Sequence, residues 1–188
     1  HDYNYSDPTI SGNTIRNNEV GIEQRWRTRG VIEGNEIYGN EVGIEIYGGD
    51  LRSTSIAIEP PDPSIQNNDI FDNFRILESG YFMRANVLIH GEFNATRNGH
   101  HRIDLRSNWW GSANPADVPD TILVDSIGAE VLPDYQGFLD NRVGAGVAVP
   151  GQFLLSAYGD VTLSGDETYT IPDTLLVRSG DTLTVPDG

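Results

Sequence analysis

A six-residue motif with the pattern Ile-x-x-Asn-x-Ile recurs along the first half of this chain. It occupies residues 10–15, returns 22 residues later at 32–37, and returns again 33 residues later at 65–70. Alternating apolar residues are typical of β-strands, because successive side chains point to opposite faces. A period in the twenties indicates stacked units that are each too small to bury their own apolar face. The repeat predicts an all-β chain that forms a right-handed parallel β-helix of about four to five coils.

The spacing also assigns positions within the tube, because equivalent residues of adjacent coils lie about 4.8 Å apart. One interior stack is predicted to contain Ile15, Ile37, Ile70 and Phe93. A second interior stack is predicted to contain Ile22, Ile44 and Leu77. A common corner is predicted for Asn13, Asn35 and Asn68, where stacked amides bond to one another and to turn backbone. The 33-residue step indicates an inserted loop within residues 48–64.

The segment Asn108-Trp109-Trp110-Gly111 resembles the closing coil of parallel β-helix repeat proteins in the pectin-lyase-like superfamily. A proline-containing loop, a strand at 121–125 and an exit segment at 131–135 follow it, as the resemblance implies. The resemblance covers about residues 8–140 and implies the fold. It leaves the activity open, because this superfamily holds lyases, hydrolases, epimerases, adhesins and inert spacers.

The sequence changes character near residue 140, which predicts three regions. Residues 1–140 are expected to form the β-helix with its closing segment, and residues 141–159 a glycine-rich linker. Residues 160–188 contain short alternating runs, and 177–188 resemble the opening coil of a β-helix in the same superfamily. We expect this last unit to begin a second β-helix or to join a neighbouring copy in an end-to-end array. A small appendage packed on the first domain is the alternative.

The composition limits the partners of this chain. It has 28 acidic residues, 12 basic residues that are all arginine, and a net charge of −16, which repels nucleic acid and anionic membranes. It has no cysteine, so disulfides and thiol chemistry are excluded. It has no run of 18 apolar residues, so no transmembrane helix is predicted. We expect an extracellular or cell-surface location.

Three glutamates, Glu23, Glu45 and Glu78, are spaced by 22 and 33 residues and are predicted to form an outward ladder. Arg25 and Tyr47 fall on the same face by alternation. Carboxylates, an arginine, an aromatic ring and an adjoining loop are the components of a polysaccharide site, so the three glutamates and Arg25 are the catalytic candidates. The resemblance to calcium-dependent lyases implies that the same glutamates are candidate Ca²⁺ ligands. The alternative is a solvated acidic stripe balanced by arginines.

Further residues are candidates for glycan contact or metal binding. Tyr47, Trp26 and Tyr81 are predicted to contact glycan, whereas Trp109 and Trp110 are expected to serve the core. A metal set of His90, His100, His101, Glu92 and Asp104 is a weaker hypothesis, because adjacent histidines on a strand face opposite sides. We expect an extracellular structural or adhesive module that contacts polysaccharide or copies of itself. The alternatives are a polysaccharide lyase, epimerase or glycoside hydrolase, and a surface ligand-binding accessory protein.

Overall fold

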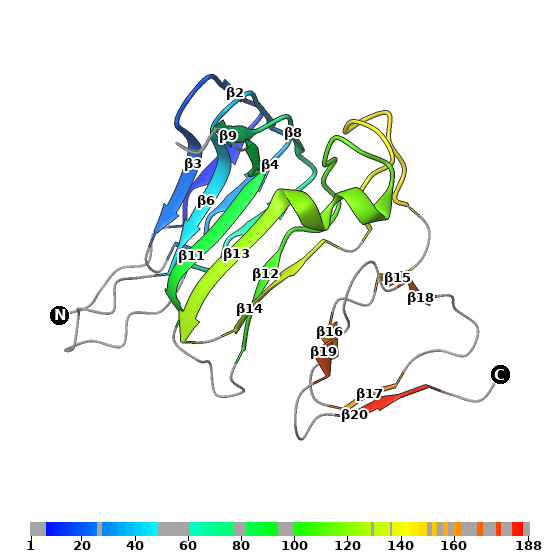
Figure 1. The fold of residues 1–188 in the computed structure, drawn as a ribbon. Helices are drawn as coiled ribbons and strands as arrows, with labels where there is room; N and C mark the ends of the chain where they lie inside the picture. Colours follow the sequence, from blue (N-terminus) through cyan, green and yellow to red (C-terminus); the bar gives the residue numbers. More distant parts are fainter. Residues whose placement is uncertain are drawn as a thin grey trace.

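The computed structural model describes residues 7–25, 28–48, 61–76, 82–93, 100–128, 130–135 and 137–149, with six short segments between 152 and 185. The described residues before 150 wind into a tube with three parallel sheets as its walls (Figure 1). Each of the first three turns contributes one strand to every wall, and the later turns add strands to two of the walls. The predicted parallel β-helix is therefore confirmed.

The strands of each sheet lie next to their counterparts from the preceding turn. The first sheet contains β1 (Thr9–Ser11), β4 (Val31–Glu33), β7 (Ser64–Gln66), β12 (His100–Asp104) and β14 (Glu130–Asp134). The second contains β2 (Thr14–Arg16), β5 (Glu36–Tyr38) and β8 (Asp69–Phe71). The third contains β3 (Val20–Arg25), β6 (Val42–Tyr47), β11 (Val87–Phe93) and β13 (Ile122–Gly128). Two 3-10 turns, η1 (Pro115–Asp117) and η2 (Pro119–Thr121), precede β13.

The isoleucines of the motif stack inside the tube as predicted. Ile15 pairs with Ile37 and Ile37 with Ile70, and the latter two are fully buried. The predicted place of Phe93 in this stack is wrong, because Phe93 is buried on β11 in the third sheet. A parallel bridge from Asp69 to Trp109 continues the second sheet instead, which brings Trp110 into the core.

The third sheet also departs from the predicted stack. Ile22 pairs with Ile44 as predicted, but the next partner of Ile44 is Val87. Leu77, predicted for that place, lies outside the described residues. The cause is an antiparallel hairpin of β9 (Phe74–Ile76) and β10 (Phe82–Arg84), which interrupts the parallel winding. The chain therefore returns to the wall about ten residues later than the repeat predicts.

Asparagines line two corners of the tube in ladders of hydrogen bonds. The first ladder is Asn13, Asn35, Asn68 and Asn108, and the second is Asn18, Asn40, Asn73 and Asn86. Each amide donates to the side-chain oxygen of the next member, as Asn35 Nδ2 does to Asn68 Oδ1 at 3.0 Å. The backbone N–H of Asn35 donates to the same oxygen, also at 3.0 Å. The predicted asparagine corner is confirmed, and its buried members have their polar groups paired.

The second ladder requires a glycine beside it. A Cβ atom on Gly43 would lie 2.6 Å from the carbonyl oxygen of Asn86 and 2.8 Å from Nδ2 of Asn73. Any larger residue would push the returning chain away from the wall. Gly43 therefore allows the close approach that lets Asn86 join the ladder after the hairpin.

Residues 138–149 form a clasp over the outer face of the second sheet. Arg142 lies over the ring of Phe71, 4.5 Å from its centroid, and its Nη1 is 2.6 Å from Glu36 Oε1. The backbone N–H of Val143 donates to Asp69 Oδ1 at 2.6 Å. Burial raises the pKa of Asp69, while the Val143 N–H and the charge of Arg142 oppose that rise. The clasp holds the end of the tube against its second sheet.

The described segments after residue 150 form three short parallel pairs. The strands are β15 (Gln152–Phe153), β16 (Ser156–Ala157), β17 (Asp160–Thr162), β18 (Tyr169–Thr170), β19 (Leu176–Val177) and β20 (Thr182–Thr184). They pair as β15 with β18, β16 with β19, and β17 with β20. Three consecutive strands thus pair in order with three later ones, and the first two, β15 and β16, fall within residues 141–159, which were predicted as a linker. The predicted region boundaries near 140 and 160 remain predictions.

Candidate functional site

The outward face of the third sheet carries two columns of side chains in register. The first column is Glu23, Glu45, Leu88 and Leu123, and the second is Arg25, Tyr47, His90 and Asp125. Alternation places them outside, because the intervening residues, such as Ile44 and Ile46, are fully buried. The predicted register of Glu23 with Glu45 and of Arg25 with Tyr47 is therefore present.

The predicted third rung of the carboxylate ladder is wrong. Leu88 pairs with Glu45 at the place predicted for Glu78, because the β9–β10 hairpin delays the return of the chain. Glu78, together with the predicted glycan contacts Trp26 and Tyr81, lies outside the described residues. The described ladder thus contains two carboxylates rather than three.

The polar residues of the two columns contact one another. Arg25 forms an ion pair with Glu23 and lies 5.2 Å from the centroid of the Tyr47 ring. The Tyr47 ring is 5.0 Å from that of His90, and the two rings are tilted by 53°. His90 Nε2 lies 2.7 Å from Glu45 Oε1, within hydrogen-bonding distance. The side chains of Arg25, Tyr47 and His90 therefore form one continuous outward row. Glu23 and Glu45 lie beside this row, where Arg25 binds Glu23 and His90 binds Glu45.

The position of His90 on this face was not predicted from the sequence. His90 was predicted to share a metal set with Asp104, but Asp104 lies on β12 of the first sheet, where it bonds to Arg106 and Gln66. The signal was available in the register, because His90 falls two residues after Leu88 on the strand that replaces the predicted one. The side chains of His100, His101 and Glu92 lie outside the described residues.

The described residues do not fit the calcium site that the resemblance implies. Ca²⁺ takes six to eight oxygen ligands, whereas Glu23 is held by Arg25 and Glu45 by His90. No group of three or more His, Asp or Glu side chains suited to a metal occurs among the described residues. The outward face of the third sheet therefore carries paired polar groups and an aromatic ring, and it lacks the set of oxygen ligands that a calcium ion needs.

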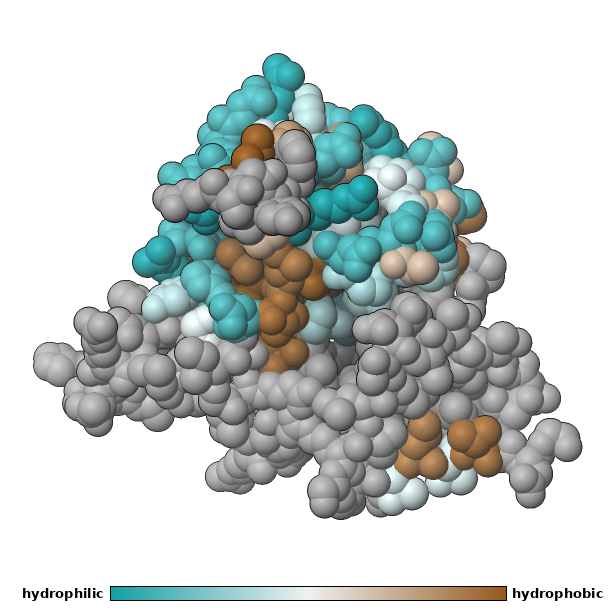
Figure 2. Space-filling view, in the orientation of Figure 1, coloured by the Kyte–Doolittle hydropathy of each residue, from teal (hydrophilic) through white to brown (hydrophobic). Residues whose placement is uncertain are grey.

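The same face becomes apolar over β11 and β13. Figure 2 shows a hydrophobic patch near its middle, flanked by hydrophilic surface. The outward Leu88 and Leu123, which are adjacent in register, are half-buried there. Polar and apolar contact areas thus lie side by side on one wall of the tube.

Among the described residues, no helix is long and apolar enough to cross a membrane.

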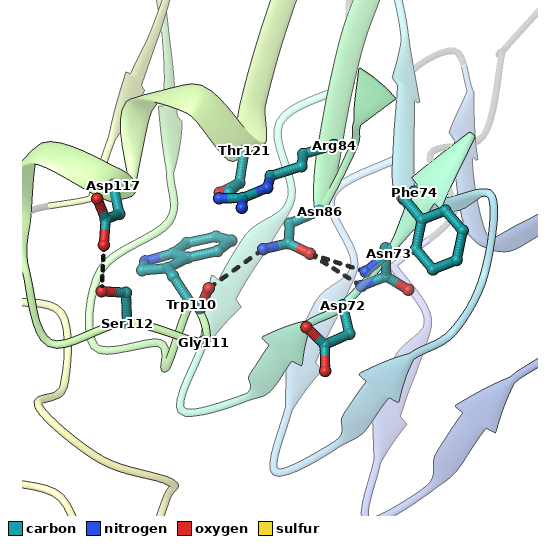
Figure 3. Close-up of a pocket in the computed structure, with 10 residues that line it drawn as sticks. All are labelled: Asp72, Asn73, Phe74, Arg84, Asn86, Trp110, Gly111, Ser112, Asp117 and Thr121. Atoms are coloured by element: carbon teal, nitrogen blue, oxygen red, sulfur yellow. Dashed lines mark hydrogen bonds between the residues drawn. The ribbon is translucent and has the colours of Figure 1, made fainter. Parts of the chain in front are cut away.

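A separate pocket of about 510 Å³ lies between the β9–β10 hairpin and the loop that carries η1 and η2 (Figure 3). Its lining residues are Asp72, Asn73, Phe74, Arg84, Asn86, Trp110, Gly111, Ser112, Asp117 and Thr121. Asn86 lies at its centre and donates to the carbonyl oxygen of Trp110 at 3.3 Å. The second asparagine ladder therefore forms a rigid floor.

The pocket combines paired and unpaired polar groups. Asp117 accepts hydrogen bonds from Ser112 Oγ at 2.7 Å and from Asn114 Nδ2 at 3.2 Å. No hydrogen bond or ion pair engages the side chains of Arg84 and Asp72 within the described part of the chain. The buried Nε1 of Trp110 also has no partner, and such an orphaned donor costs about 1–3 kcal/mol. The pocket was not predicted, because three distant segments create it.

The chain matches a family of known proteins. The family described as the right handed beta helix region matches residues 1–101, more than half of the 188-residue chain. No curated protein and no solved structure matches the chain. The matched residues include the repeats that build the first turns of the tube and the strands β3, β6 and β11 of the polar face.

Proposed function

This chain belongs to the right-handed β-helix family, and we propose that it is an extracellular structural module that adheres to glycan. The proposed contact surface, here called the binding face, consists of Glu23, Arg25, Glu45, Tyr47 and His90. A β-helix supplies a long, stiff wall with side chains at fixed spacing. Such a wall suits an extended polysaccharide, whose sugar units also repeat at fixed spacing.

The observation that carries this proposal is the continuous row of Arg25, Tyr47 and His90. Contacts on both sides orient the Tyr47 ring, since Arg25 lies 5.2 Å from its centroid and His90 5.0 Å. An aromatic ring that is already fixed loses little conformational entropy when it packs against the C–H face of a sugar. Glu23 and Glu45 beside the row can accept hydrogen bonds from sugar hydroxyls.

The contacts on the binding face support adhesion over catalysis. A glycosidase needs one carboxylic acid and one carboxylate in separate environments, whereas Glu23 and Glu45 are each bound by a basic neighbour. We therefore keep the polysaccharide lyase, epimerase or hydrolase as the alternative. Release of new reducing ends or of unsaturated products from a polysaccharide would favour that alternative.

Calorimetric titration with neutral and acidic polysaccharides tests the binding face. We expect Tyr47→Ala to weaken binding by at least about tenfold, because it removes the oriented ring. Glu45→Gln should weaken binding by a smaller factor, and Glu33→Gln, an exposed glutamate on the first sheet, should leave it unchanged. Equal affinity in wild type and Tyr47→Ala would remove this face from the proposal.

We also propose that copies of the chain associate through residues 152–185. Each described pair in this region has only two strands, so its outer strand edges present backbone groups for a further strand. Light scattering of the full chain against a version ending after residue 149 tests this proposal. Truncation there keeps the clasp, and we expect it to abolish concentration-dependent association. Identical monomeric behaviour of both proteins would contradict it.

A further inference from the structure

We infer that the pocket between the β9–β10 hairpin and the η1–η2 loop is a second binding site, and that it takes one neutral sugar residue. The site is independent of the binding face, with which it shares no residue. Its volume of about 510 Å³ falls in the range of small-molecule sites, roughly 300–1,000 Å³. Three segments that are far apart in sequence converge on it, at residues 72–74, 84–86 and 110–121.

The unpaired groups of the pocket define what a ligand must supply. The buried Trp110 indole N–H is a donor without a partner. The side chains of Arg84 and Asp72 are exposed at the pocket, and no hydrogen bond or ion pair among the described residues engages them. Figure 3 shows Arg84 extending over the indole toward Thr121, while Asp72 and Phe74 lie on the other side of Asn86. A ligand that reaches across must therefore offer acceptors at one end and donors at the other. Sugar hydroxyls do both, because each oxygen donates one hydrogen bond and accepts others.

The charges of the pocket favour a neutral ligand. Two carboxylates, Asp72 and Asp117, face one guanidinium, Arg84. The surrounding chain carries a net charge of −16, so an additional carboxylate or phosphate on the ligand would be repelled. A metal ion is not the occupant that the donor set favours, because the described residues contain no group of three or more acidic or histidine ligands.

The walls of the pocket are held in place by the fold. Trp110 is 2% exposed and belongs to the hydrophobic core, and Asn73 and Asn86 are fixed in the second ladder. Phe74 is 45% exposed at the rim, which offers an apolar surface to the C–H face of a sugar. A rigid polar floor with an aromatic rim loses little entropy on binding.

Indole N–H signals in two-dimensional nitrogen–proton spectra of the full chain test the inference. The chain has three tryptophans, and Trp110→Phe assigns the signal of interest. Titration with glucose, galactose, mannose and rhamnose should shift the Trp110 signal saturably for at least one sugar. Galacturonate should shift it less than the matching neutral galactose. If none of the four neutral sugars shifts the Trp110 signal saturably, the inference is overturned.

Two conservative variants separate a binding role from a structural one. Asp72 has φ = 51°, a conformation that asparagine tolerates well, so Asp72→Asn should keep the fold. We expect Asp72→Asn and Arg84→Ala each to weaken sugar binding by at least about tenfold, since each removes a charge-assisted hydrogen bond. Arg75→Ala, on the same hairpin but paired with Glu41, is the matched control and should bind like wild type. Unchanged affinity in both Asp72→Asn and Arg84→Ala would also overturn the inference.

The two proposed sites fail independently. Tyr47→Ala should leave the Trp110 titration unchanged, and Asp72→Asn should leave polysaccharide binding at the binding face unchanged. A chain that binds polysaccharide through Tyr47 and shows no Trp110 shift would contradict only the pocket. A chain that shows the Trp110 shift and is indifferent to Tyr47→Ala would contradict only the binding face.

Discussion

Asn86 Oδ1 accepts two hydrogen bonds from Asn73, one from the side-chain amide at 3.1 Å and one from the backbone N–H at 3.4 Å. The other members of this ladder are 22 and 33 residues apart, whereas these two are separated by 13. The chain has left the wall as a hairpin and returned to the same corner. Asn86 therefore ends the ladder that Asn73 would otherwise leave open.

Asn73→Ala should be strongly destabilising. Its side chain accepts from the backbone N–H and the amide of Asn40 and donates to the carbonyl oxygens of Ile37 and Phe71. Several buried partners would lose their bonds, so we expect a loss of about 3 kcal/mol or more in the free energy of unfolding. Urea unfolding measures it. Asn18→Ala at the exposed end of the ladder is the control, and an equal loss in both variants would contradict the prediction.

Ile37→Asp should unfold the tube. Ile37 is fully buried, with a relative exposure of 0%, and it stacks between Ile15 and Ile70. An unpaired carboxylate at this position would have no hydrogen-bond or charge partner to offset the cost of its burial. The same change at Ile76, which is 59% exposed on β9, should leave the fold intact. Far-ultraviolet circular dichroism and thermal melting distinguish the two, and a folded Ile37→Asp protein would refute the stacking.

Removal of Arg142 should loosen the clasp by a measurable but small amount. Its side chain is 52% exposed while it contacts Glu36 and Phe71, so ion pairing and the cation–π contact together should contribute about 1 kcal/mol. A double-mutant cycle with Arg142→Ala and Glu36→Gln isolates the ionic part. Strict additivity of the two changes would show that the ion pair contributes nothing to stability.

Acid sensitivity should depend on Asp104. Burial favours a higher pKa for Asp104, but hydrogen bonds from Arg106 and the charge of that guanidinium hold the pKa below its usual value of 3.8. The folded state therefore binds this proton less tightly than the unfolded state does. Its contribution to stability is present above pH 3.8 and is lost as the pH falls through the lowered pKa.

Asp104→Asn should accordingly lower stability at neutral pH and flatten its decline in acid. Asp69 provides a comparison of opposite sign, because burial raises its pKa above 3.8. Its contribution is present below pH 3.8 and is lost as the pH rises through the raised pKa. Urea unfolding of wild type, Asp104→Asn and Asp69→Asn across the acidic range measures these slopes. Changes in slope relative to wild type that have the same sign in both variants would contradict the assignment.

The repeat predicts the tube well because its physical constraints are local and periodic. The repeated isoleucines Ile15, Ile37 and Ile70 must face inward on short strands. Asparagine side chains at a shared corner form hydrogen bonds with the equivalent asparagines of adjacent turns. These relations follow from spacing alone. The parallel sheets and the first two rungs of the binding face were therefore available from the sequence.

The same pattern misassigned the third rung because two segments compete for it. Residues 76–78 and 87–89 are both rich in apolar residues that suit a strand. The structure uses the second segment, since Ala85 and Asn86 allow close approach to Gly43 and complete the ladder. Neither the hairpin nor the pocket beside it has a periodic signal, because both depend on contacts between segments that occur once.

The re-entry at Asn86 has a consequence for how this protein can change over evolution. The hairpin strands β9 and β10 lie outside both the isoleucine stacks and the asparagine ladders. Substitutions on the hairpin, including those of Phe74 and Arg84 at the pocket, can therefore accumulate during evolution without altering the isoleucine stacks. The scaffold and the proposed pocket can therefore change independently of each other.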